Sequence, residues 1–95
     1  MIVIWLPRAL DDVHRIEEER GQWSQRSADR LAAAFFNHSE RLGVFPNSGR
    51  MIPEFQMPHL REVIEQGYRV FYQVFEDRIE VFGVVHSRQD VFRDA

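Results

Sequence analysis

The chain of 95 residues contains no cysteine and no lysine. Without cysteine it can form neither a disulfide framework nor a thiolate metal site, and its composition does not point to an oxidising compartment. The one histidine that stands beside a predicted helical stripe, His38, has no second histidine or carboxylate at metal-ligand spacing. We therefore expect no metal site and no cofactor.

Long apolar runs are also missing from the sequence. No segment approaches the roughly 20 apolar residues that a membrane helix needs. The first residues, MIVIWLPRAL, lack the charged lead and the extended apolar run of a secretion signal. We expect a soluble, cytoplasmic protein without membrane contact, and a chain of this length predicts a single domain over residues 1–95 with one modest core.

The absence of lysine makes the charge pattern unusual. All twelve basic residues are arginine, while the net charge is −3. Arginine presents a rigid planar fork that matches phosphates and carboxylates, although a GC-rich genome would favour arginine codons without any functional cause. A net acidic chain is poorly suited to broad, non-specific binding of nucleic acid. A local cluster of arginines remains compatible with this composition.

The stretch from Gly67 to Asp90 predicts the centre of the fold. Two runs rich in aromatic and β-branched residues, 68–75 and 79–85, flank a short polar break, which is the pattern of a β-hairpin. The first run is apolar on both faces, as expected for a central strand that is covered on each side. Four residues of this hairpin are expected to be buried, namely Val70, Tyr72, Val81 and Phe82.

Two helices are predicted before this hairpin. Pro7 suits a first helical position, and apolar residues then recur every three or four positions up to Gly21. Ser24 is a typical N-cap for a second helix that ends at Gly43. The apolar stripes consist of Leu6, Leu10, Val13 and Ile16 in the first helix, and of Ala28, Leu31, Ala32, Phe35, Ser39 and Leu42 in the second.

The remaining segments complete the predicted order of elements. The apolar residues 2–6 are compatible with an edge strand, and residues 60–64 with a third sheet strand. The stretch 44–58 between helix and strand is expected to be a connector, since it is punctuated by proline and glycine. After Arg88 the tail is too short to fold alone, and we expect Val91 and Phe92 to tether it.

An ordered set of motifs runs along the second half of the chain, namely Pro46, Gly49-Arg50, Pro53-Glu54, Leu60-Arg61-Glu62, Gly67-Tyr68-Arg69-Val70-Phe71-Tyr72 and His86-Ser87-Arg88. With the predicted helices, this set resembles the RelE/ParE superfamily of bacterial toxins from type II toxin–antitoxin pairs. The resemblance implies an α+β fold of order β-α-α-β-β-β, with a helical hairpin packed on a small, curved and largely antiparallel sheet. It also implies a toxin that arrests growth, a role linked to plasmid stabilisation, and that forms a hetero-oligomer with its cognate antitoxin.

The superfamily holds two activities. RelE-like members cleave messenger RNA on the ribosome, which requires cations around the phosphate together with a general acid and base. By this resemblance Arg69 and Arg88 would bind the phosphate and His86 would transfer a proton. ParE-like members instead inhibit DNA gyrase by trapping its cleaved-DNA state, and they need no active site of their own.

The motifs favour the ParE branch. Leu60 and Glu62 stand where RelE-like enzymes carry a lysine pair, and the tail offers only Phe92 where those enzymes carry a base-stacking tyrosine. We therefore predict a gyrase poison, with a ribosome-dependent ribonuclease and an inactive, antitoxin-binding remnant as alternatives. The residues predicted to contact the target are Arg50, Arg61, Arg69, His86 and Arg88, while a plain ion pair of Arg69 with Glu62 or Glu80 is an equal alternative for that arginine.

Overall fold

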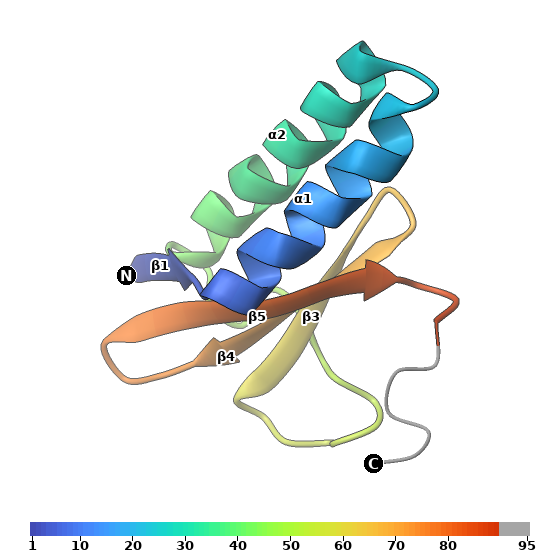
Figure 1. Cartoon of the computed structure of the whole chain (residues 1–95). Helices are drawn as coiled ribbons and strands as arrows, with labels where there is room; N and C mark the ends of the chain where they lie inside the picture. Colours follow the sequence, from blue (N-terminus) through green and yellow to red (C-terminus); the bar gives the residue numbers. More distant parts are fainter. Residues whose placement is uncertain (90–95) are drawn as a thin grey trace.

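The computed structural model describes residues 1–89, so the predicted tethering of the tail by Val91 and Phe92 lies outside the described residues. Two helices pack on one face of a five-stranded sheet whose strand order is β1-β5-β4-β3-β2 (Figure 1). The α+β prediction is therefore confirmed. The elements are β1 (Ile2–Trp5), α1 (Pro7–Gly21), α2 (Gln25–Leu42), β2 (Arg50–Met51), β3 (Leu60–Glu65), β4 (Tyr68–Val74) and β5 (Arg78–His86).

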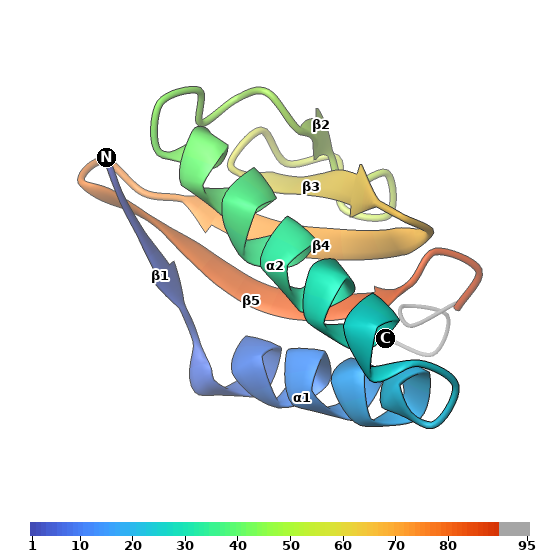
Figure 2. The ribbon, with the colours of Figure 1, turned by 90° about the horizontal axis from the view of Figure 1, so that it is seen from above.

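The sheet is largely antiparallel, as expected, and β1 is its parallel exception. Strand β1 lies at one edge and pairs with only the first part of β5, from Arg78 to Val81. Leu6 then donates its backbone N–H to the Val81 carbonyl at 3.0 Å, and Pro7 starts α1. Beyond Val81, no strand of residues 1–89 pairs with the outer side of β5, which runs beside α1 instead (Figure 2).

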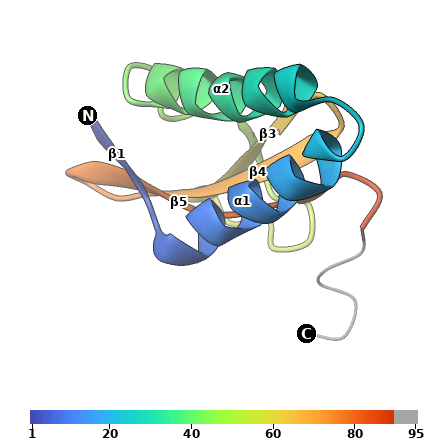
Figure 3. The same cartoon turned by 45° about the horizontal axis from the view of Figure 1, so that its top comes forward.

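Both helices lie over the same face of the sheet (Figure 3), and their buried apolar residues join the core that faces it. Ser24 caps α2 by accepting a hydrogen bond from the Ser27 backbone N–H at 3.1 Å, as the sequence predicted. In α1 the buried residues are Ala9, Val13 and Ile16, so Ala9 takes the place in the core that was predicted for Leu10, which is 36% exposed. The core that the helices share with the sheet is formed by Ala9, Val13, Ile16, Leu31, Ala32, Phe35, Leu42, Val63, Val70, Tyr72, Ile79, Val81 and Val84.

The prediction that Phe82 is buried in the hairpin is wrong, since this side chain is only partly buried. Phe71 pairs with Gly83 while Tyr72 pairs with Val81, so Phe82 is an extra residue in a β-bulge. The bulge directs the Phe82 ring away from the helices, where it stacks on Phe71 with ring centroids 5.8 Å apart. Val70, Tyr72 and Val81 are buried as predicted.

The connector predicted over residues 44–58 contains the short strand β2, which the sequence analysis missed. The loop before β2 is held against the sheet by the Tyr72 hydroxyl, which donates to the Pro46 carbonyl at 2.8 Å and accepts from the Gly49 N–H at 3.0 Å. Burial raises the pKa of the Tyr72 phenol. At Gly49 a Cβ atom would lie 2.5 Å from the Glu62 carbonyl oxygen, so only glycine fits this close approach.

Candidate functional site

A buried ion-pair network lies on the face of the sheet opposite the helices. Arg69 points to this face from β4, and its guanidinium is enclosed by two carboxylates. Glu62 on β3 accepts from Arg69 Nε at 2.9 Å and from Nη2 at 2.6 Å. Glu54, from the segment between β2 and β3, accepts from Nη1 at 2.9 Å and from Nη2 at 2.7 Å. The predicted partner Glu80 instead binds Arg78.

A second arginine completes the network from the outside. Arg50 on β2 donates to the second oxygen of Glu62, with Nε 2.8 Å and Nη2 2.6 Å from Oε2. The Glu62 side chain is fully buried, whereas that of Arg50 is 60% exposed. Glu62 therefore accepts charge-assisted hydrogen bonds from both arginines, and these bonds offset the loss of water around the buried carboxylate.

The network also shifts the pKa values of Arg69 and Glu54. The hydrogen bonds of Arg69, first to Glu54 and then to Glu62, raise the pKa of its guanidinium despite burial. The hydrogen bond from Arg69 holds the pKa of the Glu54 carboxyl below its ordinary value. Arg69 also stacks on the Phe71 ring, with its central carbon 4.9 Å from the ring centroid. Arg69 and Glu54 thus each favour the charged form of the other, and their hydrogen bonds fix the orientation of both side chains.

A small cavity of about 220 Å³ opens beside this network. Its walls are formed by Arg50, Pro53, Glu54, Ile64, Arg69 and Ser87. This opening thus brings together two arginines, a carboxylate, a hydroxyl and apolar side chains. We treat it as a candidate site for a charged ligand or partner group.

His86 lies on the other side of the sheet from Arg69. In the pairing of β4 with β5, His86 stands opposite Tyr68, and the two rings meet edge to face at 5.4 Å. Tyr68 packs against the helix-side core. Since successive side chains of a strand alternate between faces, Tyr68 with His86 and Arg69 point in opposite directions. The structure therefore does not bring Arg69 and His86 together.

The two remaining predicted residues lie apart from the network. Arg88 is exposed just beyond β5, and its backbone N–H donates to His86 Nδ1 at 3.2 Å. Arg61 is partly buried and binds backbone carbonyls, with 2.8 Å from Nε to Pro58 O and 2.8 Å from Nη1 to Gly49 O. Arg61 thereby holds the loop before β2, and its guanidinium is already engaged inside the chain.

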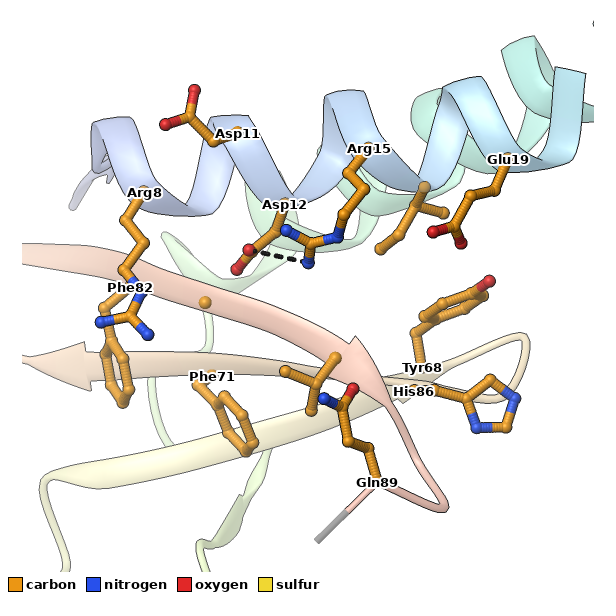
Figure 4. Close-up of a pocket in the computed structure, with 13 residues that line it drawn as sticks. Arg8, Asp11, Asp12, Arg15, Glu19, Tyr68, Phe71, Phe82, His86 and Gln89 are labelled. Carbon is orange, nitrogen blue, oxygen red and sulfur yellow. Dashed lines mark hydrogen bonds and ion pairs between the residues drawn. The ribbon is translucent and has the colours of Figure 1, made fainter. Parts of the chain in front are cut away.

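A larger groove of about 800 Å³ runs between α1 and the free part of β5 (Figure 4). Asp12 reaches from α1 and accepts from the backbone N–H of Val84 at 2.9 Å, and Arg15 donates to its other oxygen at 3.1 Å. Phe71 and Phe82 line the groove on the side of β5 away from α1 (Figure 4). Charged helix residues and an aromatic floor thus border an open sheet edge.

Comparison of the sequence with models of known protein families gives a match over most of the chain. The family model described as the ParE toxin of the type II toxin–antitoxin system, parDE, matches residues 3–91. The chain belongs to the ParE toxin family. No curated protein sequence matches this chain.

Two solved structures are similar to this ParE-family fold. The chromosomal ParDE toxin–antitoxin system from P. aeruginosa contains a chain with a TM-score of 0.76 and 17% identity, covering 90% of this chain and 95% of that one. The RelBE2 toxin–antitoxin complex from Mycobacterium tuberculosis gives a TM-score of 0.66, also at 17% identity and with the same two coverages. At 17% sequence identity, these similarities show that the chains share a fold.

Sequence reasoning missed two parts of the candidate site in this ParE-family toxin. Glu54 was noted only as part of a motif, although it forms a two-point pair with Arg69. The sequence analysis gave no role to Asp12 on α1, although this side chain accepts a hydrogen bond from the Val84 backbone N–H in the groove. Within residues 1–89 no cluster of histidine and acidic side chains is suited to a metal ion, and neither helix is long and apolar enough to cross a membrane.

Glu54 should make the stability of the protein sensitive to acid. Folding lowers the pKa of Glu54. Its contribution to the free energy of unfolding is therefore fully present above the unfolded glutamate pKa of about 4.3, and it is lost as the pH falls through the lower folded pKa. A Glu54→Gln protein should be less stable than wild type at pH 7, and this gap should narrow as the pH falls below the unfolded glutamate pKa and through the lower folded one. Urea unfolding across this range measures the gap, with Glu76→Gln at the exposed hairpin turn as control. A gap that stays constant with pH would contradict the assignment.

Proposed function

We propose that this ParE-family toxin poisons DNA gyrase through surface contact and is neutralised by a co-encoded antitoxin. The observation that carries the proposal is the separation of the residues that an RNA-cleaving site would need. Arg69 is enclosed by two carboxylates on one face of the sheet, and His86 packs on Tyr68 on the other. A toxin that acts by binding its target needs no catalytic site, so Arg69 and His86 do not have to lie close together.

The ribonuclease alternative would require large rearrangements. A phosphate at Arg69 could take only the place of the partly exposed Glu54, because Glu62 is fully buried and removing one partner of a buried ion pair is strongly unfavourable. A general acid or base must also come within hydrogen-bond reach of the reacting atoms. His86 cannot approach the site of Arg69 while it faces Tyr68.

Contact with gyrase would use the exposed arginines. Arg88 and the outer side of Arg50 are the accessible cations among the five predicted residues, and exposed arginines form charge-assisted bonds with acidic partner groups. Arg61 is proposed here only as the residue that shapes the loop before β2, because its Nε and Nη1 already bind backbone carbonyls.

The antitoxin would cover the groove between α1 and β5. This groove combines the unpaired part of a sheet edge with apolar rings from Phe71 and Phe82. Such a surface suits an extended or helical peptide with apolar side chains. The two structural neighbours are both toxin–antitoxin complexes, which supports an antitoxin partner and a hetero-oligomer.

Two parallel assays distinguish the activities. Purified protein is incubated with gyrase and relaxed or supercoiled plasmid, and separately with ribosomes that carry a defined message. We expect supercoiling to be inhibited or plasmid to be linearised, while the message stays intact. Addition of the product of the neighbouring gene should restore supercoiling if that gene encodes the antitoxin. Message cut on the ribosome with gyrase unaffected would overturn the proposal, and no effect in either assay would favour an inactive remnant.

The same two assays can be applied to point variants of the toxin. His86→Ala should reduce gyrase inhibition only modestly, because no chemical step depends on the imidazole. Arg88→Ala should reduce it more, through loss of an exposed cation. If the protein were a ribonuclease, loss of a general acid or base would lower the rate by about 10²–10⁴-fold. An effect of that size at His86 would therefore contradict the contact mechanism.

A further inference from the structure

The two carboxylates around Arg69 differ in how firmly they are held. Glu62 is part of β3, its side chain is fully buried, and it is bound a second time by Arg50. Glu54 lies between β2 and β3, outside any regular element, and its side chain is 32% exposed. The inner partner of Arg69 is therefore fixed by the sheet, whereas the outer partner is held mainly by the guanidinium itself.

The outer pair has the geometry of a binding site that is already filled. Arg69 Nη1 and Nη2 donate to the two oxygens of Glu54 at 2.9 and 2.7 Å. This parallel, two-point arrangement is the one by which arginine recognises a carboxylate from another molecule. We propose that the outer edge of the Arg69 guanidinium is a binding site for an aspartate or glutamate of a partner protein, and that Glu54 occupies it in the isolated chain.

Exchange of one carboxylate for another conserves the main interactions. The incoming group accepts the same two hydrogen bonds, and the released Glu54 becomes hydrated without disturbing a strand. Once Glu54 has left, Arg50 and Arg69 oppose the single charge of Glu62, so the site carries one net positive charge. A monoanion neutralises this charge. The neighbouring contacts therefore decide which carboxylate occupies the site.

Those neighbouring contacts favour a protein over a nucleic acid. The cavity of about 220 Å³ beside Arg69 is lined by Pro53 and Ile64, and Ile64 is 48% exposed. The segment that carries Glu54 also presents Phe55 and Met57, which are 38% and 42% exposed. Apolar side chains next to an acidic residue of a partner would cover this surface, whereas a chain of net charge −3 repels a polyanion. The choice of a protein partner rests on the proposed function.

A binding experiment with a defined peptide tests the site. The probe is the capped tripeptide acetyl-Leu-Glu-Leu-amide, with acetyl-Leu-Gln-Leu-amide as its uncharged counterpart and a short oligothymidylate as the nucleic-acid arm. Calorimetric titration compares the wild-type protein with Glu54→Gln. Glu80→Gln is the matched control, because Glu80 also binds an arginine of the sheet but at a separate place.

We expect Glu54→Gln to bind the acidic peptide about tenfold or more tightly than wild type, since the competing carboxylate has been removed. Glu80→Gln should bind like wild type, and the glutamine peptide should not gain affinity. The NMR signals of the Arg69 Nη–H groups, which donate to Glu54 in the isolated chain, should shift on addition of the acidic peptide only. Glu54→Ala provides the same comparison if Glu54→Gln folds poorly.

Two results would overturn the proposal. Equal affinity of wild type and both Glu54 variants for the acidic peptide would show that Glu54 does not occupy a binding site. A gain for oligothymidylate without a gain for the peptide would assign the site to nucleic acid. Gyrase does not enter this experiment, so its outcome is separate from that of the supercoiling assay.

Discussion

An Arg69→Met protein is expected to lose about 3–5 kcal/mol of unfolding free energy. The guanidinium of Arg69 is 8% exposed and lies against Glu62, whose side chain is fully buried. Methionine occupies a similar volume but leaves Glu62 with Arg50 as its remaining cation in this network, so a buried charge is only partly compensated. Equilibrium unfolding in urea measures the loss, provided that the slope of the transition is unchanged.

Two comparisons show whether the loss comes from the buried charge. Arg78→Met is the matched control, because Arg78 also binds two carboxylates, Asp77 and Glu80, but is 35% exposed. Solvent screening makes such exposed ion pairs contribute little to stability, so we expect a much smaller loss for Arg78→Met. The double variant Arg69→Met with Glu62→Met should recover most of the lost stability, since it removes both buried charges. A single Arg69→Met variant within 1 kcal/mol of wild type would show that the network does not hold the sheet.

A Phe35→Ala protein is also expected to lose about 3–5 kcal/mol of stability. Phe35 lies in the middle of α2, is 0% exposed, and meets the Tyr68 ring edge to face at 5.6 Å. Its removal leaves a cavity between helix and sheet that neighbouring side chains fill only in part. Thermal or urea unfolding provides the measurement.

Phe82→Ala is the same chemical change at a partly buried position. Its ring stacks on Phe71 at the bulge, outside the helix-side core. We expect a loss of roughly 1–2 kcal/mol, from partial burial and ring stacking. Equal losses for Phe35→Ala and Phe82→Ala would mean that Phe82 is a core residue and that the bulge is misplaced.

The sequence by itself determined the elements whose signals are local. The helix that starts at Pro7, the N-cap at Ser24 and the long hairpin around residues 76–78 follow from backbone chemistry and apolar periodicity within a few residues. The central place of β4 also followed, because a strand that is apolar on both faces needs neighbours on both sides. The family resemblance rested on motifs distributed over these same elements.

The position of Phe82 and the existence of β2 were decided by tertiary structure. Simple alternation predicts which face of a strand a residue occupies, but one extra residue in β5 changes this for Phe82. Strand β2 has only two residues, and it exists because its register places Arg50 beside Glu62 on β3. Neither signal is contained in a short window of sequence.

The candidate site depended on tertiary structure most of all. The sequence offered both Glu62 and Glu80 as partners for Arg69, and the tertiary structure chose Glu62, since Glu80 lies opposite Gln73 in the β4–β5 pairing. Glu54 reaches Arg69 from 15 positions away along the chain. His86 was grouped with Arg69 by motif, yet strand alternation places them on opposite faces. Ion pairs form between groups that the fold brings within about 4 Å, and this proximity is a property of the complete sheet.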